Sequence, residues 1–62
     1  MTPFSPGQRY SDGGVLRLTV LGLTERGWRC EVRNLHTGGY CTIRSSPNEL
    51  MDALVTGGWR TI

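Results

Sequence analysis

The sequence has no lysine, two cysteines and one histidine among its 62 residues, and these scarcities argue against metal and nucleophile chemistry. A structural zinc site takes four N or S ligands. Cys30, His36 and Cys41 supply three, so an aspartate or a second chain would have to complete the site. We therefore expect no metal and no cofactor. A catalytic cysteine needs an exposed thiolate beside a base, whereas both thiols fall on apolar strand faces, which predicts a protein that is not an enzyme.

Long apolar runs are also absent. The longest apolar-leaning stretch, residues 15–23, contains Arg17, Thr19 and Gly22, whereas a membrane-spanning helix needs about 20 apolar residues. Residues 1–6 have neither the charged start nor the apolar centre of a secretory signal. We therefore expect a cytoplasmic protein with no membrane association.

What the chain does contain is a small set of large apolar side chains and many turn-forming residues. Apolar residues make up 37%, with one Phe, two Trp and two Tyr, which is enough for one small core. A chain of this length buries only about 60% of its unfolded surface, so there is little room for an enclosed catalytic cavity. We expect residues 1–62 to form a single small domain, with residues 1–6 as a loose N-terminal arm.

Alternation of apolar and polar residues predicts several short strands. They are expected at residues 8–10, 16–20, 28–32, 40–44 and 59–62. Glycine-containing polar segments at 11–14, 24–27 and 34–39 predict the turns between them. Trp28, Cys30 and Val32 fall on one face, as is typical of a strand that is buried on one side. Trp28 and Trp59 are the side chains large enough to anchor the core.

Two registers are compatible with the pairing of the third and fourth expected strands. If the numbers of opposite residues sum to an odd total, Cys41 and Ile43 share the face of Trp28. A type I turn closed by Gly38 gives the other register, in which Tyr40 and Thr42 share the face of Trp28. Burial favours the odd sum with Cys41 and Ile43 inside, and a bulge at the glycine pair would reconcile it with the turn. Both thiols are then expected to be small buried groups, or a disulfide if Cys30 directly faces Cys41.

The most specific local pattern is the segment Ser46-Pro47-Asn48-Glu49. A hydroxyl N-cap, a proline at the first helical position and a glutamate at the third predict the start of a helix at this point. The following apolar residues are spaced to form one buried stripe on it. The glycine pair 57–58 predicts its end.

This order of strands, with a short helix before the last one, resembles the SH3-like barrels. It is similar above all to short SH3-like proteins of phages and other mobile elements. The shared features are a Gly7-Gln8-Arg9-Tyr10 start, the alternating runs 16–20 and 28–32, and a Gly58-Trp59-Arg60 ending. The resemblance implies a mainly β fold, a small antiparallel barrel of about five strands whose closure removes exposed edges. It carries no activity to transfer.

Arginine is the feature that points to a function, because all seven basic residues are arginines. If the alternation is correct, four of them project from one outer face: Arg17, Arg29, Arg33 and Arg44. The guanidinium group binds phosphate bidentately and stacks on bases. We therefore predict a binding module that contacts DNA or RNA through this outer face, with an ordinary solvated surface as the alternative.

Two other kinds of partner are compatible with the sequence. One is a host protein, bound by a phage or mobile-element module through Tyr10, Tyr40 and the loop at His36, since SH3-like barrels bind partners between their loops. The tyrosines fall at the edge of the core or on the surface. The other is a second copy of the chain, because a domain this small gains stability from assembly through an exposed sheet edge.

Overall fold

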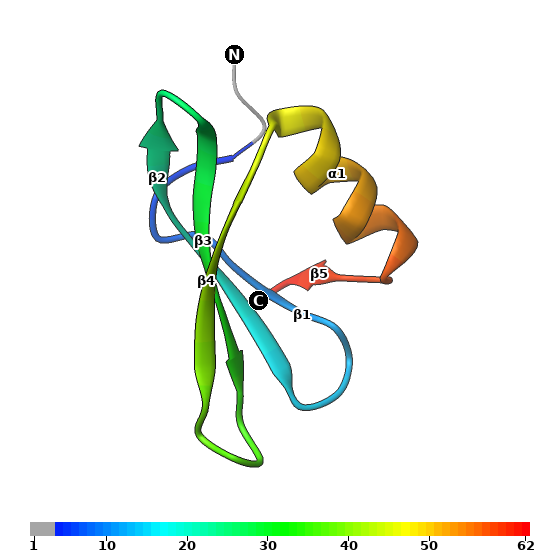
Figure 1. The fold of residues 1–62 in the computed structure, drawn as a ribbon. Helices are drawn as coiled ribbons and strands as arrows, with labels where there is room; N and C mark the ends of the chain where they lie inside the picture. Colours follow the sequence, from blue (N-terminus) through cyan, green and yellow to red (C-terminus); the bar gives the residue numbers. More distant parts are fainter. Residues whose placement is uncertain (1–3) are drawn as a thin grey trace.

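The computed structural model describes residues 4–62 as one antiparallel sheet and one helix. The elements are β1 (Arg9–Ser11), β2 (Leu16–Thr24), β3 (Gly27–Asn34), β4 (Tyr40–Ser45), α1 (Pro47–Thr56) and β5 (Arg60–Thr61). The strand order is β4-β3-β2-β1-β5, so four strands follow one another as a meander and β5 returns beside β1 (Figure 1). The expected mainly β fold with a short helix before the last strand is confirmed.

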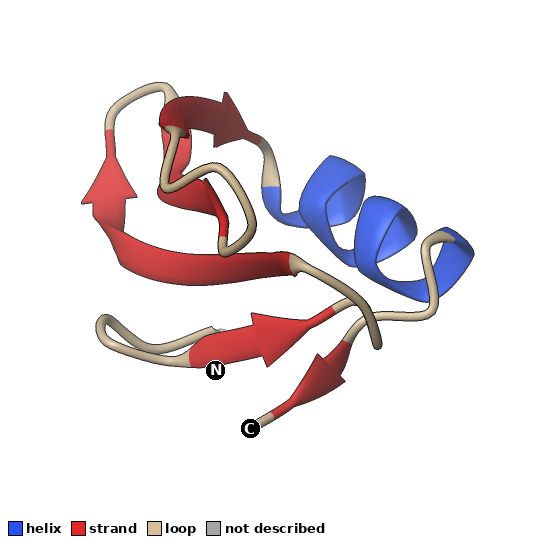
Figure 2. Ribbon diagram, turned by 90° about the horizontal axis from the view of Figure 1, so that it is seen from below, coloured by secondary structure: helices blue, strands red, loops and turns tan. Residues whose placement is uncertain are grey.

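The sheet curves, and α1 packs against one of its faces, which we call the inner face (Figure 2). The opposite, helix-free face is the outer face. β4 and β5 form the two edges, and no backbone pairing joins them within residues 4–62. The fold therefore has the element order of the expected small barrel without hydrogen-bonded closure in the described residues.

The register between β3 and β4 is the odd-sum alternative, with Cys30 opposite Ile43 and Val32 opposite Cys41. The expectation that Cys41 and Ile43 are inside is wrong, however. They share the face of Cys30, but Cys41 is exposed and Ile43 is 37% exposed. The reason is that α1 covers the end of the sheet near the β2–β3 turn, while the far end of the β3–β4 hairpin extends beyond it (Figure 1). Both thiols are free, since Cys30 does not directly face Cys41.

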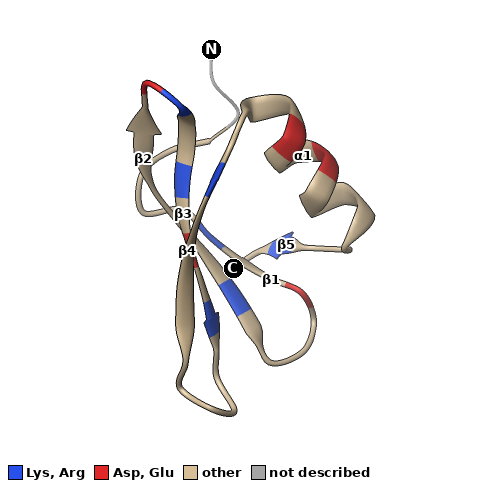
Figure 3. Ribbon diagram, in the orientation of Figure 1, with Lys and Arg blue, Asp and Glu red and all other residues tan. Residues whose placement is uncertain are grey.

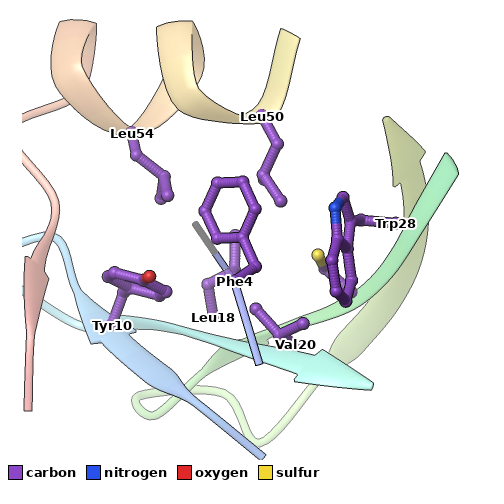
Figure 4. Close-up of a cluster of buried hydrophobic side chains, with 8 residues drawn as sticks. Phe4, Tyr10, Leu18, Val20, Trp28, Leu50 and Leu54 are labelled. Atoms are coloured by element: carbon purple, nitrogen blue, oxygen red, sulfur yellow. The ribbon is translucent and has the colours of Figure 1, made fainter. Parts of the chain in front are cut away.

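Eight buried side chains form one core between the sheet and α1. They are Phe4, Tyr10, Leu18, Val20, Trp28, Cys30, Leu50 and Leu54 (Figure 4). The predicted core position of Trp28 is confirmed, because this ring is 3% exposed. Trp59 is partly buried and packs against the cluster from outside.

The expectation that residues 1–6 form a loose arm is wrong for Phe4, and residues 1–3 lie outside the described part. Phe4 is 3% exposed, and its ring makes edge contacts with Tyr10 at 6.5 Å and Trp28 at 5.7 Å between centroids. The backbone that follows is also held, since the Gly7 N–H donates to the Val20 carbonyl at 2.7 Å. With a single phenylalanine in the chain, burial of its ring outweighs the turn-forming character of its neighbours.

The helix begins as its sequence predicts. Ser46 is the N-cap, and its hydroxyl oxygen accepts from the Glu49 backbone N–H at 3.3 Å. The hydroxyl also donates to the Glu49 carboxylate at 3.0 Å. Leu50 and Leu54 form the buried stripe. The helix ends at Thr56, directly before the glycine pair.

Replacing the cap tests this account of α1. We expect Ser46→Ala to lower the free energy of unfolding by about 1 kcal/mol, because the Glu49 N–H then lacks its side-chain acceptor. Ser46→Asp keeps an acceptor at the cap and should retain wild-type stability. Urea unfolding followed by circular dichroism measures both changes, and equal midpoints for the alanine variant and the wild type would place the start of the helix elsewhere.

Candidate nucleic-acid interface

The strand register places the four predicted arginines together on the outer face. Arg17 lies directly opposite Arg33 across β2 and β3, and Arg29 lies directly opposite Arg44 across β3 and β4. A bulge in β2 changes which residue Arg29 faces but leaves both arginine pairs on the outer face. One extra residue between Val20 and Gly22 shifts the register, and Arg29 therefore faces Gly22 on the outer side.

Two further arginines join this face from the other half of the sheet. Arg9 of β1 is opposite Thr19, and Arg60 of β5 is opposite Ser11, which in turn faces Arg17. Six of the seven arginines thus share one side of the sheet, and Arg26 lies in the β2–β3 turn. We call this set the arginine face: Arg9, Arg17, Arg29, Arg33, Arg44 and Arg60 (Figure 3). Sequence reasoning missed Arg9 and Arg60, which lie on strands of three and two residues.

The arginine face is only slightly neutralised by acidic groups. Within residues 4–62 its one salt bridge joins Arg33 Nη2 to Glu31 Oε1 at 3.0 Å. Arg17 Nη1 instead donates to the carbonyls of Gly14 and Leu16 at 2.7 and 2.8 Å, which holds the side chain without removing its charge. On the other side of the molecule α1 carries two acidic residues and no basic one (Figure 3). The helix side therefore carries only negative charge within α1.

The arginine face contains two depressions. The larger has a volume of about 530 Å³, and its lining residues are Arg9, Arg17, Thr19, Glu31, Arg33, Leu35 and Ile62. The smaller, of about 310 Å³, lies at the β2–β3 turn and is lined by Thr24, Glu25, Arg26, Arg29 and Arg44. Each depression brings three guanidinium groups together with one threonine hydroxyl and one glutamate carboxylate. Such a set of donors suits the oxygen atoms of a bound anion.

Tyr40 adds an aromatic surface to the same face. Its side chain is 68% exposed, and the guanidinium carbon of Arg33 lies 5.6 Å from the ring centroid. An exposed ring beside an arginine is a platform on which a base can stack. The two cross-strand neighbours Arg33 and Tyr40 thus combine a phosphate-binding group with a stacking group.

The other predicted partner-binding residues do not form a site. Tyr10 is buried on the inner face, where burial, with a smaller contribution from Cys30, raises the pKa of its hydroxyl. Tyr40 lies on the outer face, and His36 is exposed in the β3–β4 turn. The prediction that Tyr10 binds a partner is therefore wrong, because the core needs its ring. Tyr40 and His36 remain accessible on different parts of the hairpin.

Metal-ligating side chains do not gather within the described residues. No cluster of three or more His, Cys, Asp or Glu side chains that could hold a metal ion occurs within residues 4–62. Burial raises the pKa of the Cys30 thiol, which disfavours the nucleophilic thiolate. No helix in the same part of the chain has the length and apolar character needed to cross a bilayer.

No protein-family model, curated protein or solved structure matches the chain. The resemblance to small SH3-like proteins of mobile elements stays a prediction, and the function has to be argued from the arginine face.

Proposed function

We propose that the protein is a non-enzymatic module that binds nucleic acid through the arginine face. The observation that supports this most directly is the pair of like-charge contacts across the sheet. Arg17 faces Arg33 and Arg29 faces Arg44. Like charges directly opposite each other destabilise a sheet by a few tenths of a kcal/mol to about 1 kcal/mol per pair. A polyanion that lies across the face removes this repulsion, so the arrangement favours the bound state.

The chemistry of the face fits phosphate groups. The guanidinium group presents a planar fork that matches two phosphate oxygens. The strands of a sheet lie about 4.8 Å apart, so arginines on neighbouring strands can follow a phosphate backbone across several positions. Glu31, which lies between Thr19 and Thr42, restricts the contact to the two flanking arginine groups.

The shape of the site favours single strands over duplexes. Tyr40 offers an exposed ring for an unpaired base, whereas the bases of a duplex are stacked on one another. Recognition of a duplex commonly places a helix in the major groove. The only helix in residues 4–62 is acidic and lies on the inner side of the sheet. The same proposal places the protein in the cytoplasm with the accessory proteins of phages and mobile elements that it resembles.

Fluorescence anisotropy with labelled oligonucleotides tests the proposal. We expect binding to single-stranded DNA or RNA that is tighter than binding to the matched duplex and that weakens steeply with salt, since each phosphate contact releases counterions. The double variant Arg29→Gln with Arg44→Gln should weaken binding by about ten- to a hundredfold. It should also lower the salt slope by roughly 1.4, which corresponds to two contacts on a single strand. Neither arginine takes part in the salt bridge of this face, so the fold should be retained.

A charge-matched control separates a specific face from net charge. Asn48→Asp with Val55→Glu also lowers the net charge by two, but at exposed positions of α1 on the opposite side. This variant should keep most of the affinity. Equal losses in the two double variants would show that only net charge matters. No binding by the wild type at low salt would disprove the proposed function and leave Tyr40 and His36 to be tested against a protein partner.

A further inference from the structure

The outer edge of β4 is open. Tyr40–Ser45 pairs with β3 on one side, and no strand of residues 4–62 lies on its other side. Five of the six residues of β4 are exposed. A six-residue edge without a proline, a bulge or a covering loop is an efficient template for pairing with another strand. The sequence and the register of β4 together indicate which strand it accepts.

The hydrogen-bond pattern defines which backbone groups face outward. The Asn34 N–H donates to the Gly39 carbonyl at 2.8 Å, so this pair is hydrogen-bonded. Pairs alternate along an antiparallel ladder, and Val32 with Cys41 and Cys30 with Ile43 are therefore the next hydrogen-bonded pairs. The intervening residues of β4 direct their N–H and C=O groups to the free edge. These residues are Tyr40, Thr42 and Arg44.

We propose that a second copy of the chain pairs with this edge, antiparallel, with Thr42 of each copy opposite Thr42 of the other. In this register Tyr40 of one copy lies opposite Arg44 of the second copy, and every outward backbone group of the three residues is paired. The Tyr40 ring, which Arg33 already contacts at 5.6 Å, then has an arginine on each side. The arrangement therefore combines backbone hydrogen bonds with contacts between arginine and an aromatic ring.

Neighbouring registers are poorer. A shift by two residues in either direction leaves one of the outward residues without a strand partner. A shift by four places Arg44 opposite Arg44 of the second copy, or Tyr40 opposite Tyr40 of the second copy. The register with Arg44 opposite Arg44 of the second copy places like charges directly opposite each other. The chain is thus most complementary to itself when Thr42 lies on the two-fold axis.

The inner side of the same edge supports this register. Cys41 lies opposite Ile43 of the second copy, and both residues are exposed in the single chain. Pairing covers these apolar groups on both copies. A two-fold axis normal to the sheet keeps the two outer faces on one side, so the dimer joins two arginine faces into one continuous surface. Dimerisation itself does not depend on the proposed function.

Sedimentation velocity without nucleic acid, over a wide range of protein concentration, tests the interface. We expect the wild type to reach the mass of two chains as concentration rises. Thr42→Pro removes an outward N–H and leaves the β3–β4 ladder intact, so it should weaken dimerisation by at least about tenfold. Thr42→Val keeps that N–H and should dimerise like the wild type. A wild type that is monomeric throughout, or a folded Thr42→Pro chain that dimerises normally, would overturn the proposal.

Cysteine cross-linking tests the register, and it keeps the proposal testable if Thr42→Pro fails to fold. Opposite residues of a hydrogen-bonded pair have Cα atoms about 5.5 Å apart, which is within disulfide range. Thr42→Cys should therefore form a covalent dimer under mild oxidation. The wild type is the matched control, because Cys41 of the two copies lie diagonally across the axis. Efficient cross-linking of the wild type, or none of Thr42→Cys, would overturn this register.

Discussion

Trp28→Ala is expected to lower the free energy of unfolding by about 3–5 kcal/mol and to leave much of the chain unfolded at room temperature. A domain of 62 residues has a total stability of roughly 3–9 kcal/mol, if each residue contributes about 0.05–0.15 kcal/mol. Loss of the indole therefore removes a large part of what holds the fold together. The large loss of stability follows from the position of Trp28 in the core as well as from the size of its ring.

Trp28 joins the three parts of the core. It lies on the inner face of β3, its ring contacts Phe4 edge to face at 5.7 Å between centroids, and the cluster also includes Leu50 of α1 (Figure 4). Among the buried residues of this cluster in residues 4–62, Trp28 has the largest side chain. The rigid backbone of the sheet cannot move to fill the cavity that alanine leaves. The loss of unfolding free energy therefore lies near the upper end of the range for truncated core residues.

Trp28→Phe is the matched control. It keeps an aromatic ring for the contact with Phe4, and it removes an indole Nε1–H that is buried without a hydrogen-bond partner in the described residues. Removal of an unsatisfied donor offsets part of the lost burial, so we expect a loss of roughly 1–2 kcal/mol. Chemical denaturation followed by far-UV circular dichroism measures both variants. An unchanged midpoint for Trp28→Ala would place the ring at the surface and reopen the possibility of an aromatic binding groove.

The local structure of this chain could be predicted from sequence wherever one short pattern determines it. The hydroxyl, proline and glutamate that begin α1 act within four residues, and the structure shows the cap at Ser46. The alternation in β2 and β3 separates an apolar face from a charged one, and burial follows it at Leu18, Val20 and Cys30. The register of β4 was also predictable, because a slip by one residue would exchange the two faces.

The sequence could not predict which part of the sheet the helix covers. Cys41 and Ile43 are on the inner face as predicted, but a ten-residue helix reaches only one end of the sheet and leaves them exposed. Phe4 behaves in the opposite way, since turn-forming neighbours suggest a free arm and tertiary packing nevertheless buries the ring. Both errors concern long-range contacts, which no local pattern encodes.

The candidate site was predictable in part for the same reason. Alternation placed Arg17, Arg29, Arg33 and Arg44 on one face, and the register confirms it. Arg9 was missed, although it alternates with the buried Tyr10 within β1 and could have been assigned to the outer face. The larger depression was beyond prediction, because it forms only when β1, β2 and β3 lie side by side and Ile62 returns next to Arg9.

Gly27→Ala is the second substitution with a large expected effect, about 3 kcal/mol or more of unfolding free energy. Gly27 begins β3 directly after the β2–β3 turn, with φ at +114°, a backbone conformation that strains any L side chain. A Cβ atom at this position would clash with the Ser45 carbonyl oxygen and would lie 2.9 Å from the Ser45 carbonyl carbon. Both atoms belong to backbone, so no side-chain rotation relieves the contact.

The clash would spread to elements that matter for the proposed function. Ser45 ends β4, and Ser46, whose backbone nitrogen lies 3.2 Å from the added Cβ, is the cap of α1. Moving this segment away disturbs the helix start and the strand that carries Arg44. We therefore expect Gly27→Ala to weaken oligonucleotide binding as well as stability, even though no charge changes.

Two other glycines serve as controls that separate the effect of the positive φ from the effect of the steric clash. Gly38→Ala tests the backbone conformation alone, because Gly38 has φ at +78° and nothing lies within 4 Å of an added Cβ; a loss of about 1–2 kcal/mol is expected. Gly22→Ala has open space without the positive φ and should change stability by less than about 1 kcal/mol. Urea unfolding of the three variants gives the comparison. If Gly27→Ala costs no more than Gly38→Ala, the close approach of β4 to the β2–β3 turn does not exist in solution.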